Sequence, residues 1–187
     1  ERVRSLVAET DADRVVFLGD LGNHIGEPSG AELEELMDLE HDLRAVDVTL
    51  VPGNHDGRLG DVLDFDVADG DGVVVGDVGF VHGHSWPSDE VLAADVLAVG
   101  HEHPTVRLAD EVGGSRIERV WMRGPLSSAP FERHAGAAAD PPIDGDLVVF
   151  PAFNDLVGGT WVNVDEQDFL SPFLPAASPD ADAYLLD

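Results

Sequence analysis

Residues 48–56 read Val-Thr-Leu-Val-Pro-Gly-Asn-His-Asp. The run Val48–Val51 is typical of a strand that is buried on both faces of a sheet in an α/β protein. Gly53 and Asn54 are ordinary turn residues, so a tight turn after the strand explains both of them. A turn does not explain His55, and this histidine therefore indicates a functional site at the end of the strand.

The same arrangement, a short apolar run followed by glycine or histidine and polar side chains, occurs at three further places. Functional sites in α/β proteins collect at the carboxyl ends of strands, where neighbouring loops lie close together. Glycine at such a corner allows the backbone to turn sharply and to approach an ion closely. The four strand ends are therefore predicted to bring a carboxylate, an amide oxygen and several imidazoles together; they are Gly19-Asp20, Gly53-Asn54-His55-Asp56, His82-Gly83-His84 and Gly100-His101-Glu102-His103.

The donor atoms at these strand ends are nitrogen and oxygen, and the chain contains no cysteine. Such a set suits Mn, Fe or Zn better than Ca or Mg. Each piece alone has an ordinary explanation, because Gly-Asp follows many strands by chance and a lone histidine is more often packed or solvated. Together, and in this order along the chain, the four pieces predict a metal site.

The rest of the sequence predicts one α/β domain over residues 1–187. Apolar side chains in the first residues recur at the spacing of one helix face, which predicts an opening helix. Ser29 and Glu32 match a capping box at the start of a second helix. Ser88 is the predicted cap of a short third helix. Strands or hairpins are predicted at residues 15–18, 48–51, 73–81, 96–99, 105–122, 147–150, 160–164 and 184–187, and a long mobile loop is predicted at 125–146.

The charge of the chain is extreme. Aspartate and glutamate number 38 against 10 basic residues, all of them arginine, for a formal net charge of -28. Such a charge destabilises a compact state by self-repulsion in dilute buffer, whereas concentrated salt screens it. The composition resembles that of proteins from extremely halophilic archaea and predicts adaptation to salt; an acidic protein from a low-salt cell is the alternative. Arg123 and Arg133 are candidates for binding phosphate, although arginine in an acidic chain more often pairs with a carboxylate.

The acidic charge does not exclude a nucleic-acid substrate, because concentrated salt also weakens the repulsion between carboxylates and phosphates. No apolar run approaches the length of a membrane span and no secretory signal peptide is visible, so the sequence predicts a cytoplasmic protein without membrane contact. The chain opens with Glu1 inside a predicted helix, and we expect further residues to precede it. Nothing in the sequence indicates an oligomeric state.

The order and wording of the motifs resemble the calcineurin-like metallophosphoesterases. The signature of that superfamily runs Asp-x-His, Gly-Asp-x-x-Asp, Gly-Asn-His-Asp or -Glu, a His-Gly element and Gly-His-x-His, and the resemblance covers most of residues 14–104. It implies an α/β/β/α sandwich, that is, two mixed sheets flanked by helices. Residues 100–104, with 150–154 and Gly158-Gly159, are most similar to the archaeal SbcD-related (ICC-like) phosphoesterases.

The resemblance implies two divalent metal ions, with Mn as the first choice and Fe or Zn as alternatives. Asp20 matches the carboxylate that bridges both ions, and His103 matches a further ligand of the first ion. The ligands that complete the second ion match Asn54, His82 and His101.

General acid catalysis is also implied by the resemblance. His55 matches the histidine that binds no metal and donates a proton to the leaving oxygen, and its family partner is the second aspartate of Gly-Asp-x-x-Asp. That position is Asn23 here, whose amide can orient an imidazole but cannot stabilise an imidazolium as a carboxylate does. The adjacent His24 is a candidate substitute or an exposed loop residue. Asp56 and His84 are candidates for supporting the ligands or contacting substrate, and a structural role for His84 stays open.

The first motif of the superfamily is absent, because no Asp-x-His occurs in the 187 residues. We expect the strand that carries it to precede Glu1, since a central strand is hard to omit from a buried sheet. The predicted reaction is hydrolysis of a phosphoester by a hydroxide that bridges the metals, with Asp20 and His55 as catalytic residues. Phosphodiesters, including nucleic acid or nucleotides, are the first choice of substrate and phosphomonoesters the second. The alternative is a non-catalytic or impaired protein that keeps the scaffold for binding or assembly, as Asn23 and the absent motif would suggest.

Overall fold

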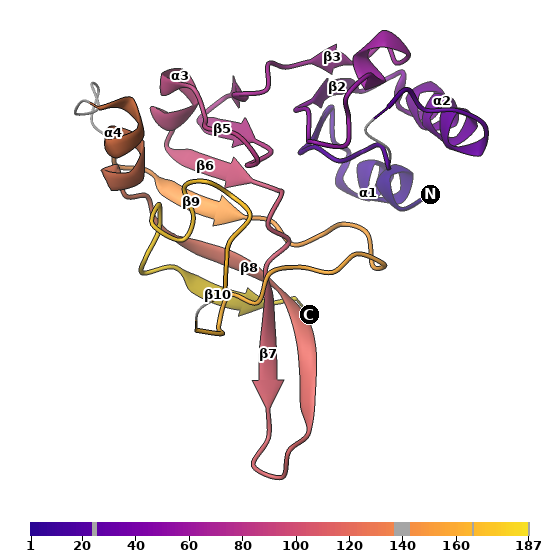
Figure 1. Cartoon of the computed structure of the whole chain (residues 1–187). Coiled ribbons are helices and arrows are strands. Elements are labelled where there is room, and N and C mark those ends of the chain that lie inside the picture. Colours follow the sequence, from indigo (N-terminus) through magenta and orange to yellow (C-terminus); the bar gives the residue numbers. More distant parts are fainter. Residues whose placement is uncertain (24–25, 137–142, 166, 187) are drawn as a thin grey trace. The chain divides into compact units, whose positions relative to one another are not determined.

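The computed structural model describes residues 1–23, 26–136, 143–165 and 167–186. The described chain falls into two compact units, Glu1–Gly70 and Asp71–Asp187. Each unit contains one β-sheet with helices beside it (Figure 1). The predicted α/β class with two sheets and flanking helices is therefore confirmed, whereas the single domain over residues 1–187 stays a prediction. None of the described helices is both long and apolar enough to span a bilayer.

The first unit holds a parallel sheet with the strand order β1-β2-β3. β1 (Arg14–Phe17) and β2 (Asp47–Leu50) are joined through helix α2 (Ala31–Leu43), and the 3-10 helix η1 (Leu59–Asp61) precedes β3 (Asp66–Val67). Parallel neighbours need such a crossover because both strands run in the same direction. The core of this unit draws on α2, β2 and the segment around η1 through Leu36, Leu50, Leu59 and Leu63.

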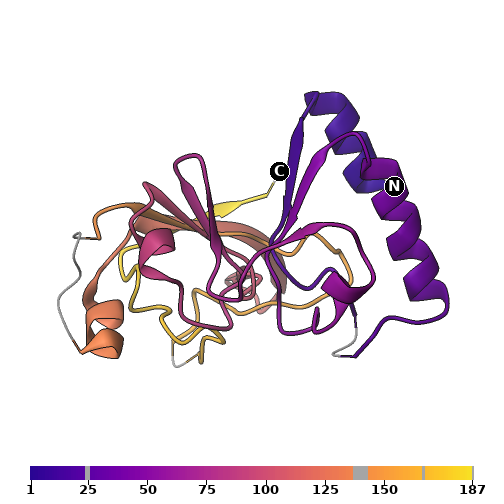
Figure 2. The same cartoon turned by 90° about the horizontal axis from the view of Figure 1, so that it is seen from above.

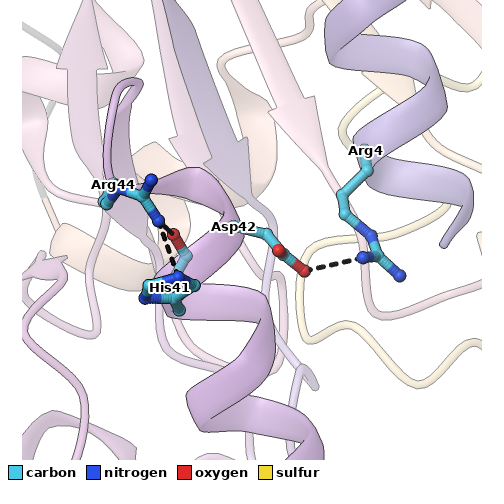
Figure 3. A network of polar contacts seen from close by, with 4 residues as sticks. All are labelled: Arg4, His41, Asp42 and Arg44. Atoms are coloured by element: carbon cyan, nitrogen blue, oxygen red, sulfur yellow. Dashed lines mark hydrogen bonds and ion pairs between the residues drawn. The ribbon is translucent and has the colours of Figure 1, made fainter.

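Helix α1 (Arg2–Thr10) confirms the predicted opening helix, although none of its residues is buried. It lies beside α2 on one side of the first sheet (Figure 2), and Arg4 pairs with Asp42 at 3.0 Å between nitrogen and oxygen (Figure 3). At the end of α2, Arg44 donates to the ring Nε2 of His41 at 2.7 Å and to its carbonyl oxygen at 3.2 Å. Exposed contacts of this kind contribute little stability, so α1 adds little to the core of the unit.

The predicted capping box of α2 is wrong. The residue before the helix is Gly30, which has a φ of 59° and no side chain to cap the first turn. The carboxylate of Glu32 instead accepts a hydrogen bond from the backbone N–H of Asn23 at 2.7 Å. The helix begins one residue later than the predicted box requires, so Gly30 rather than Ser29 occupies the N-cap position, and Glu32 bonds to the loop that follows β1.

The second unit holds a mixed sheet with the order β10-β8-β9-β6-β5-β4, and β7 also pairs with β8. Both predicted hairpins, β4–β5 and β7–β8, are confirmed, and the second extends well beyond the rest of its sheet (Figure 1). The predicted C-terminal strand is confirmed as β10, which pairs with β8. The strands are β4 (Val73–Val75), β5 (Val78–Val81), β6 (Val96–Val99), β7 (Thr105–Ala109), β8 (Ser115–Pro125), β9 (Asp146–Val149) and β10 (Asp182–Leu185).

Two short helices pack beside this sheet. Helix α3 (Asp89–Leu92) begins after Ser88, whose Oγ accepts the N–H of Val91 at 3.4 Å, and the predicted cap is therefore confirmed. Helix α4 (Ala129–Ala135) follows β8. The core of the unit collects buried side chains from strands, helices and the C-terminal segment, among them Val81, Leu97, Phe131, Leu147 and Phe173.

Helix α4 corrects the prediction of a long mobile loop over residues 125–146. Pro130 fits the first turn of a helix, Phe131 is buried in the core, and Gly136 ends the helix with a φ of 72°. Apolar burial, which a reading of composition does not detect, therefore gives this proline- and alanine-rich segment regular structure. Residues 137–142 of the predicted loop lie outside the described residues.

The strand predicted at residues 160–164 is also wrong, because these residues form only an isolated bridge between Thr105 and Trp161. The side chain of Asn163 explains why the ladder stops. Its Oδ1 accepts the backbone N–H of Arg107 at 2.8 Å, and its Nδ2 donates to the carbonyl oxygen of Arg107 at 2.9 Å. An amide side chain thus occupies the β7 groups that a further strand would use.

Parallel pairing sets where the candidate residues leave each sheet. β1 and β2 are parallel, so the loops after Phe17 and Leu50 begin at the same end of the first sheet. β5 and β6 are parallel as well, so the loops after Val81 and Val99 begin at the same end of the second sheet. Each unit therefore presents two of the four predicted strand ends as neighbours.

Candidate metal centre

In the first unit, Asp20 lies directly over the loop that carries Asn54 and His55. Its Oδ1 accepts the backbone N–H of His55 at 3.0 Å. A methyl group added to Gly53 would collide with the Oδ1 and the backbone nitrogen of Asp20. The loop after β2 therefore needs glycine at position 53, because only glycine lets the carboxylate of Asp20 approach this closely.

Asp56 holds the two loops of the first unit together. The side chain is 4% exposed, its Oδ1 accepts the N–H of Gly22 at 2.8 Å, and its Oδ2 accepts the N–H of Gly53 at 2.8 Å. Both carboxylate oxygens are thus engaged with backbone donors on the loops that follow β1 and β2. The contacts agree with a supporting role for Asp56, which stays a prediction.

Asn23 and His55 are not joined by a hydrogen bond within the described part of the chain. The side chain of Asn23 is exposed, and its backbone N–H donates to Glu32. His55 is partly buried. The predicted substitute His24 lies outside the described residues.

In the second unit, His82 and His101 face each other across two parallel strand ends. The Nε2 of His82 and the Nδ1 of His101 are 3.0 Å apart, and His82 is 1% exposed. The backbone fixes this pairing, because the carbonyl oxygen of His82 accepts the N–H groups of Gly100 at 2.9 Å and His101 at 2.8 Å.

The spacing of the two ring nitrogens fits a shared metal ion. Two nitrogen ligands at about 2.0–2.1 Å from one ion, at angles of about 90–110°, would lie roughly 2.9–3.4 Å apart. The observed separation of 3.0 Å falls within that range. The separation is compatible with a shared ion and equally with a hydrogen bond between the two rings, so the ligand role of these histidines stays a prediction.

His84 joins the same cluster of imidazoles. Its ring centroid lies 5.4 Å from that of His82 and 6.0 Å from that of His101, and the rings of His82 and His101 are 4.8 Å apart. The sequence predicted either substrate contact or a structural role for His84. The position beside two candidate ligands agrees with either of them.

His103 has an unusual backbone. Its φ is 47°, in the left-handed region that non-glycine residues rarely adopt. A methyl group on Gly159 would collide with the carbonyl oxygen of His103, so the segment that covers this loop also requires glycine. Asp20 is left-handed too, with a φ of 52°. Such strain persists mainly where the surrounding structure enforces it, and it is concentrated at functional sites.

Arg123, a candidate for binding phosphate, is paired with a carboxylate. Arg123 donates to Asp146 at 2.8 Å, and this hydrogen bond, together with the charge of Asp146, raises the pKa of Arg123. For Arg123 the carboxylate pairing is thus the observed contact rather than a free phosphate site. Arg133 lies on α4. His134, to which the sequence assigned no role, stacks on Trp86 with ring centroids 4.0 Å apart.

Glu102 is the residue whose importance the sequence did not reveal. It stands between His101 and His103 in the quoted motif, yet its side chain is 0% exposed. Its carboxylate accepts hydrogen bonds from Thr160, Leu170 and Ser171. The only local signal was a glutamate at the end of a buried strand.

The structure thus brings the predicted residues into two sets. The first unit gathers Asp20, Asp56 and the loop of Asn54 and His55, and the second unit gathers His82, His84 and His101, with His103 two residues further on. Convergence of both sets on one pocket stays a prediction.

Comparison with known proteins adds a family and a fold. A family model described as calcineurin-like phosphoesterase matches residues 1–132. Among solved structures, the chain is similar to a nuclease of Pseudomonas putida, described as nuclease MPE, with 22% sequence identity and a TM-score of 0.60; the match covers 90% of this chain and 71% of that one. At this identity the likeness concerns the fold alone. A search of curated proteins found no match.

Proposed function

The chain belongs to the calcineurin-like phosphoesterase family, and from this premise we propose that it is a metal-dependent hydrolase of phosphodiesters. Nucleic acid or a nucleotide is the proposed substrate class. The similarity to a protein described as a nuclease supports this choice over phosphomonoesters. The acidic surface does not oppose it, provided that salt screens the repulsion between carboxylates and phosphates.

We assign five residues as ligands of two divalent ions, with Mn proposed first and Fe or Zn as alternatives. For His82 and His101 the assignment is supported by their facing nitrogens, 3.0 Å apart, and for Asp20, Asn54 and His103 it rests on their places in the sequence motifs. Bound ions of this kind supply an activated water nucleophile at neutral pH and neutralise charge that develops on the phosphoryl oxygens. The proposed ligands are Asp20, Asn54, His82, His101 and His103.

His55 is the proposed general acid. Its imidazole would donate a proton to the oxygen that leaves phosphorus. This protonation matters most where the oxygen would otherwise depart as a basic alkoxide. The backbone N–H of His55 donates to Asp20 at 3.0 Å, so the acid and the proposed bridging carboxylate are tied by one hydrogen bond. Because the donor is a backbone N–H, a side-chain substitution at His55 leaves this hydrogen bond in place, whereas Asp20→Ala removes it.

The alternative, an impaired enzyme that binds rather than hydrolyses, rests on one observation. Asn23 replaces the aspartate of the family motif, and the described structure shows no hydrogen bond from Asn23 to His55. Without a carboxylate to orient its imidazole and to pair with the protonated ring, His55 would be a less effective general acid–base residue. Origin from a salt-adapted archaeon, kinship with the SbcD-related branch and a cytoplasmic location likewise stay proposals.

Hydrolysis of bis(p-nitrophenyl) phosphate with added Mn²⁺ in molar KCl tests the proposal. We expect turnover by the wild-type chain and loss of both turnover and bound metal in His101→Ala. His134→Ala, which removes an imidazole stacked on Trp86 and outside the proposed centre, serves as the matched control. Metal binding without hydrolysis in the wild type would favour the binding alternative, and absence of both would refute the metal site.

A further inference from the structure

We propose that Glu102 is a positioning residue that fixes the loops carrying His82, His101 and His103 through a second segment of the chain, described at residues 160–165 and 167–171. The inference rests on the proposed function in one respect, namely that these histidines bind metal. Glu102 occupies the position x of the family motif Gly-His-x-His, to which the motif assigns no role.

Each carboxylate oxygen of Glu102 accepts two hydrogen bonds. Its Oε1 accepts the hydroxyl of Thr160 at 3.1 Å and the N–H of Leu170 at 2.6 Å. Its Oε2 accepts the same N–H at 3.1 Å and the N–H of Ser171 at 3.1 Å. Among the described residues, every hydrogen bond to the carboxylate comes from a donor, so a side chain with only acceptors fits and an amide does not.

Ser171 extends this network to the neighbouring strand end. While its N–H donates to Glu102, its hydroxyl donates to the carbonyl oxygen of Gly83 at 2.7 Å. Gly83 lies between His82 and His84, and Ser171 is 3% exposed. One buried serine therefore ties the loop after β5 to the loop after β6.

Thr160 fixes the other side of the same loop. Its N–H donates to the carbonyl oxygen of Glu102 at 3.2 Å, and its own carbonyl oxygen accepts the N–H of Thr105 at 2.8 Å. Beside it, Gly159 contacts the carbonyl group of His103 closely enough to exclude any side chain. The segment thus encloses the loop from Glu102 to Thr105 and supports the left-handed backbone of His103.

In this arrangement Glu102 positions the loops that carry the imidazoles and does not itself bind the ion. Both oxygens of Glu102 are occupied by the protein, so the carboxylate is not available as a ligand. Groups behind metal ligands orient the ligands, and their loss typically weakens metal affinity about 10–100-fold. Loss of the Glu102 network is expected to act in the same way.

The test compares Glu102→Gln with Glu118→Gln, a matched change on β8 whose carboxylate pairs with Arg116 on the surface. Both proteins are studied in molar KCl, below their melting temperatures. Amide hydrogen exchange is measured for peptides that cover 82–84 and 100–103, and Co²⁺ titration gives both affinity and the visible spectrum of the bound ion. In Glu102→Gln we expect faster exchange in both peptides, about 10–100-fold weaker Co²⁺ binding and an altered spectrum, with wild-type behaviour in Glu118→Gln.

Unchanged exchange at 82–84 and 100–103 in Glu102→Gln would overturn the proposal, as would faster exchange with wild-type Co²⁺ affinity and spectrum. Faster exchange in a protein whose wild type binds no Co²⁺ would support the positioning of the loops and refute the proposed function instead. If Glu102→Gln does not fold, the test is made with Ser171→Ala. This change removes the hydroxyl that donates to Gly83 and leaves the backbone N–H that donates to Glu102. Faster exchange at 82–84 is then expected, and wild-type exchange there would contradict the network.

Discussion

Asp20 and His103 are proposed metal ligands with a left-handed backbone, at φ values of 52° and 47°. This conformation costs a non-glycine residue roughly 1–2 kcal/mol. Asp11 shares it, but as the residue that ends α1, where left-handed residues are common. At Asp20 and His103 the neighbouring Gly53 and Gly159 leave the room that the strained backbone needs. Strained backbone that the surrounding structure holds in place at two proposed ligands agrees with a preformed site, whose ligands are fixed before the ion arrives.

Substitutions at Asp20 and His55 should have different consequences. Asp20→Ala removes the proposed shared carboxylate, so metal content and activity should fall together. His55→Ala removes a proton donor but no ligand, so metal should stay while kcat falls about 10²–10⁴-fold. The measurement is metal analysis beside kinetics on phosphodiesters with poor and good leaving groups. The loss of kcat should shrink for an aryl oxide, which departs without protonation. Loss of metal in His55→Ala would show that His55 is a ligand.

Asn23→Asp should raise kcat on poor leaving groups without changing metal content. The aspartate would stabilise the imidazolium of His55, which the amide of Asn23 cannot do. The backbone bond from Asn23 to Glu32 does not involve the side chain and should survive the substitution. Steady-state kinetics checks this expectation, and Asn154→Asp is the control, because the exposed Asn154 uses, among the described residues, only its Oδ1, which accepts the N–H of Leu156 at 2.9 Å. A lower kcat in Asn23→Asp would mean that the native amide contributes directly to the reaction.

The loops after β1 and β2 form one element, and Asp56 holds it together. The two N–H groups that it accepts, from Gly22 and Gly53, belong to different loops. A buried carboxylate that satisfies backbone donors contributes more than an exposed ion pair, because its removal leaves the donors without partners. In the second unit, Glu102 does the same for the loops after β5 and β6. Beside each sheet, therefore, a buried carboxylate that accepts backbone N–H groups directly follows a proposed site histidine.

Asp56→Ala should lower the free energy of unfolding by about 2–4 kcal/mol, because two buried N–H groups lose a charged acceptor. Urea unfolding in molar KCl, followed by circular dichroism, measures this loss. Asp47→Ala is the matched control, since the side chain of Asp47 is 79% exposed and should change stability by less than about 0.5 kcal/mol. Equal stability of the two variants would show that the loops do not depend on Asp56.

The whole molecule carries a net charge of -28 and contains no lysine. The ion pairs of its arginines are mostly exposed; Arg58, for example, lies between Glu27 and Asp61, whose carboxylates raise the pKa of Arg58. Exposed pairs contribute little in any solvent. We therefore expect self-repulsion among the excess carboxylates to be the main electrostatic effect on stability.

The melting temperature should climb steeply between dilute buffer and molar KCl, as the Debye length falls to about 3 Å. Differential scanning calorimetry over a KCl series measures the rise. A parallel series in sucrose, which favours compact states without screening charge, separates screening from exclusion of solute. A flat response to KCl would mean that the acidic surface serves another purpose than tolerance of salt.

The sequence by itself determined what depends on neighbours along the chain. Apolar runs predicted β2, β5 and β6 to within one or two residues, and glycine and histidine after each run marked the strand ends. These signals are local, because a buried strand and the turn that ends it need only a few consecutive residues. The motif order even identified the family, which the match over residues 1–132 confirms.

Only the tertiary structure decided the contacts made by distant segments. Glu102 and Ser171 are 69 residues apart, and nothing near either residue predicts their hydrogen bond. The same holds for α4, which forms because Phe131 finds a core, and for residues 160–164, where the side chain of Asn163 replaces a strand partner of β7. Glu32 likewise accepts the N–H of Asn23 instead of forming the predicted capping box. A polar group bonds to whichever partner the fold brings within reach, and local sequence does not encode that partner.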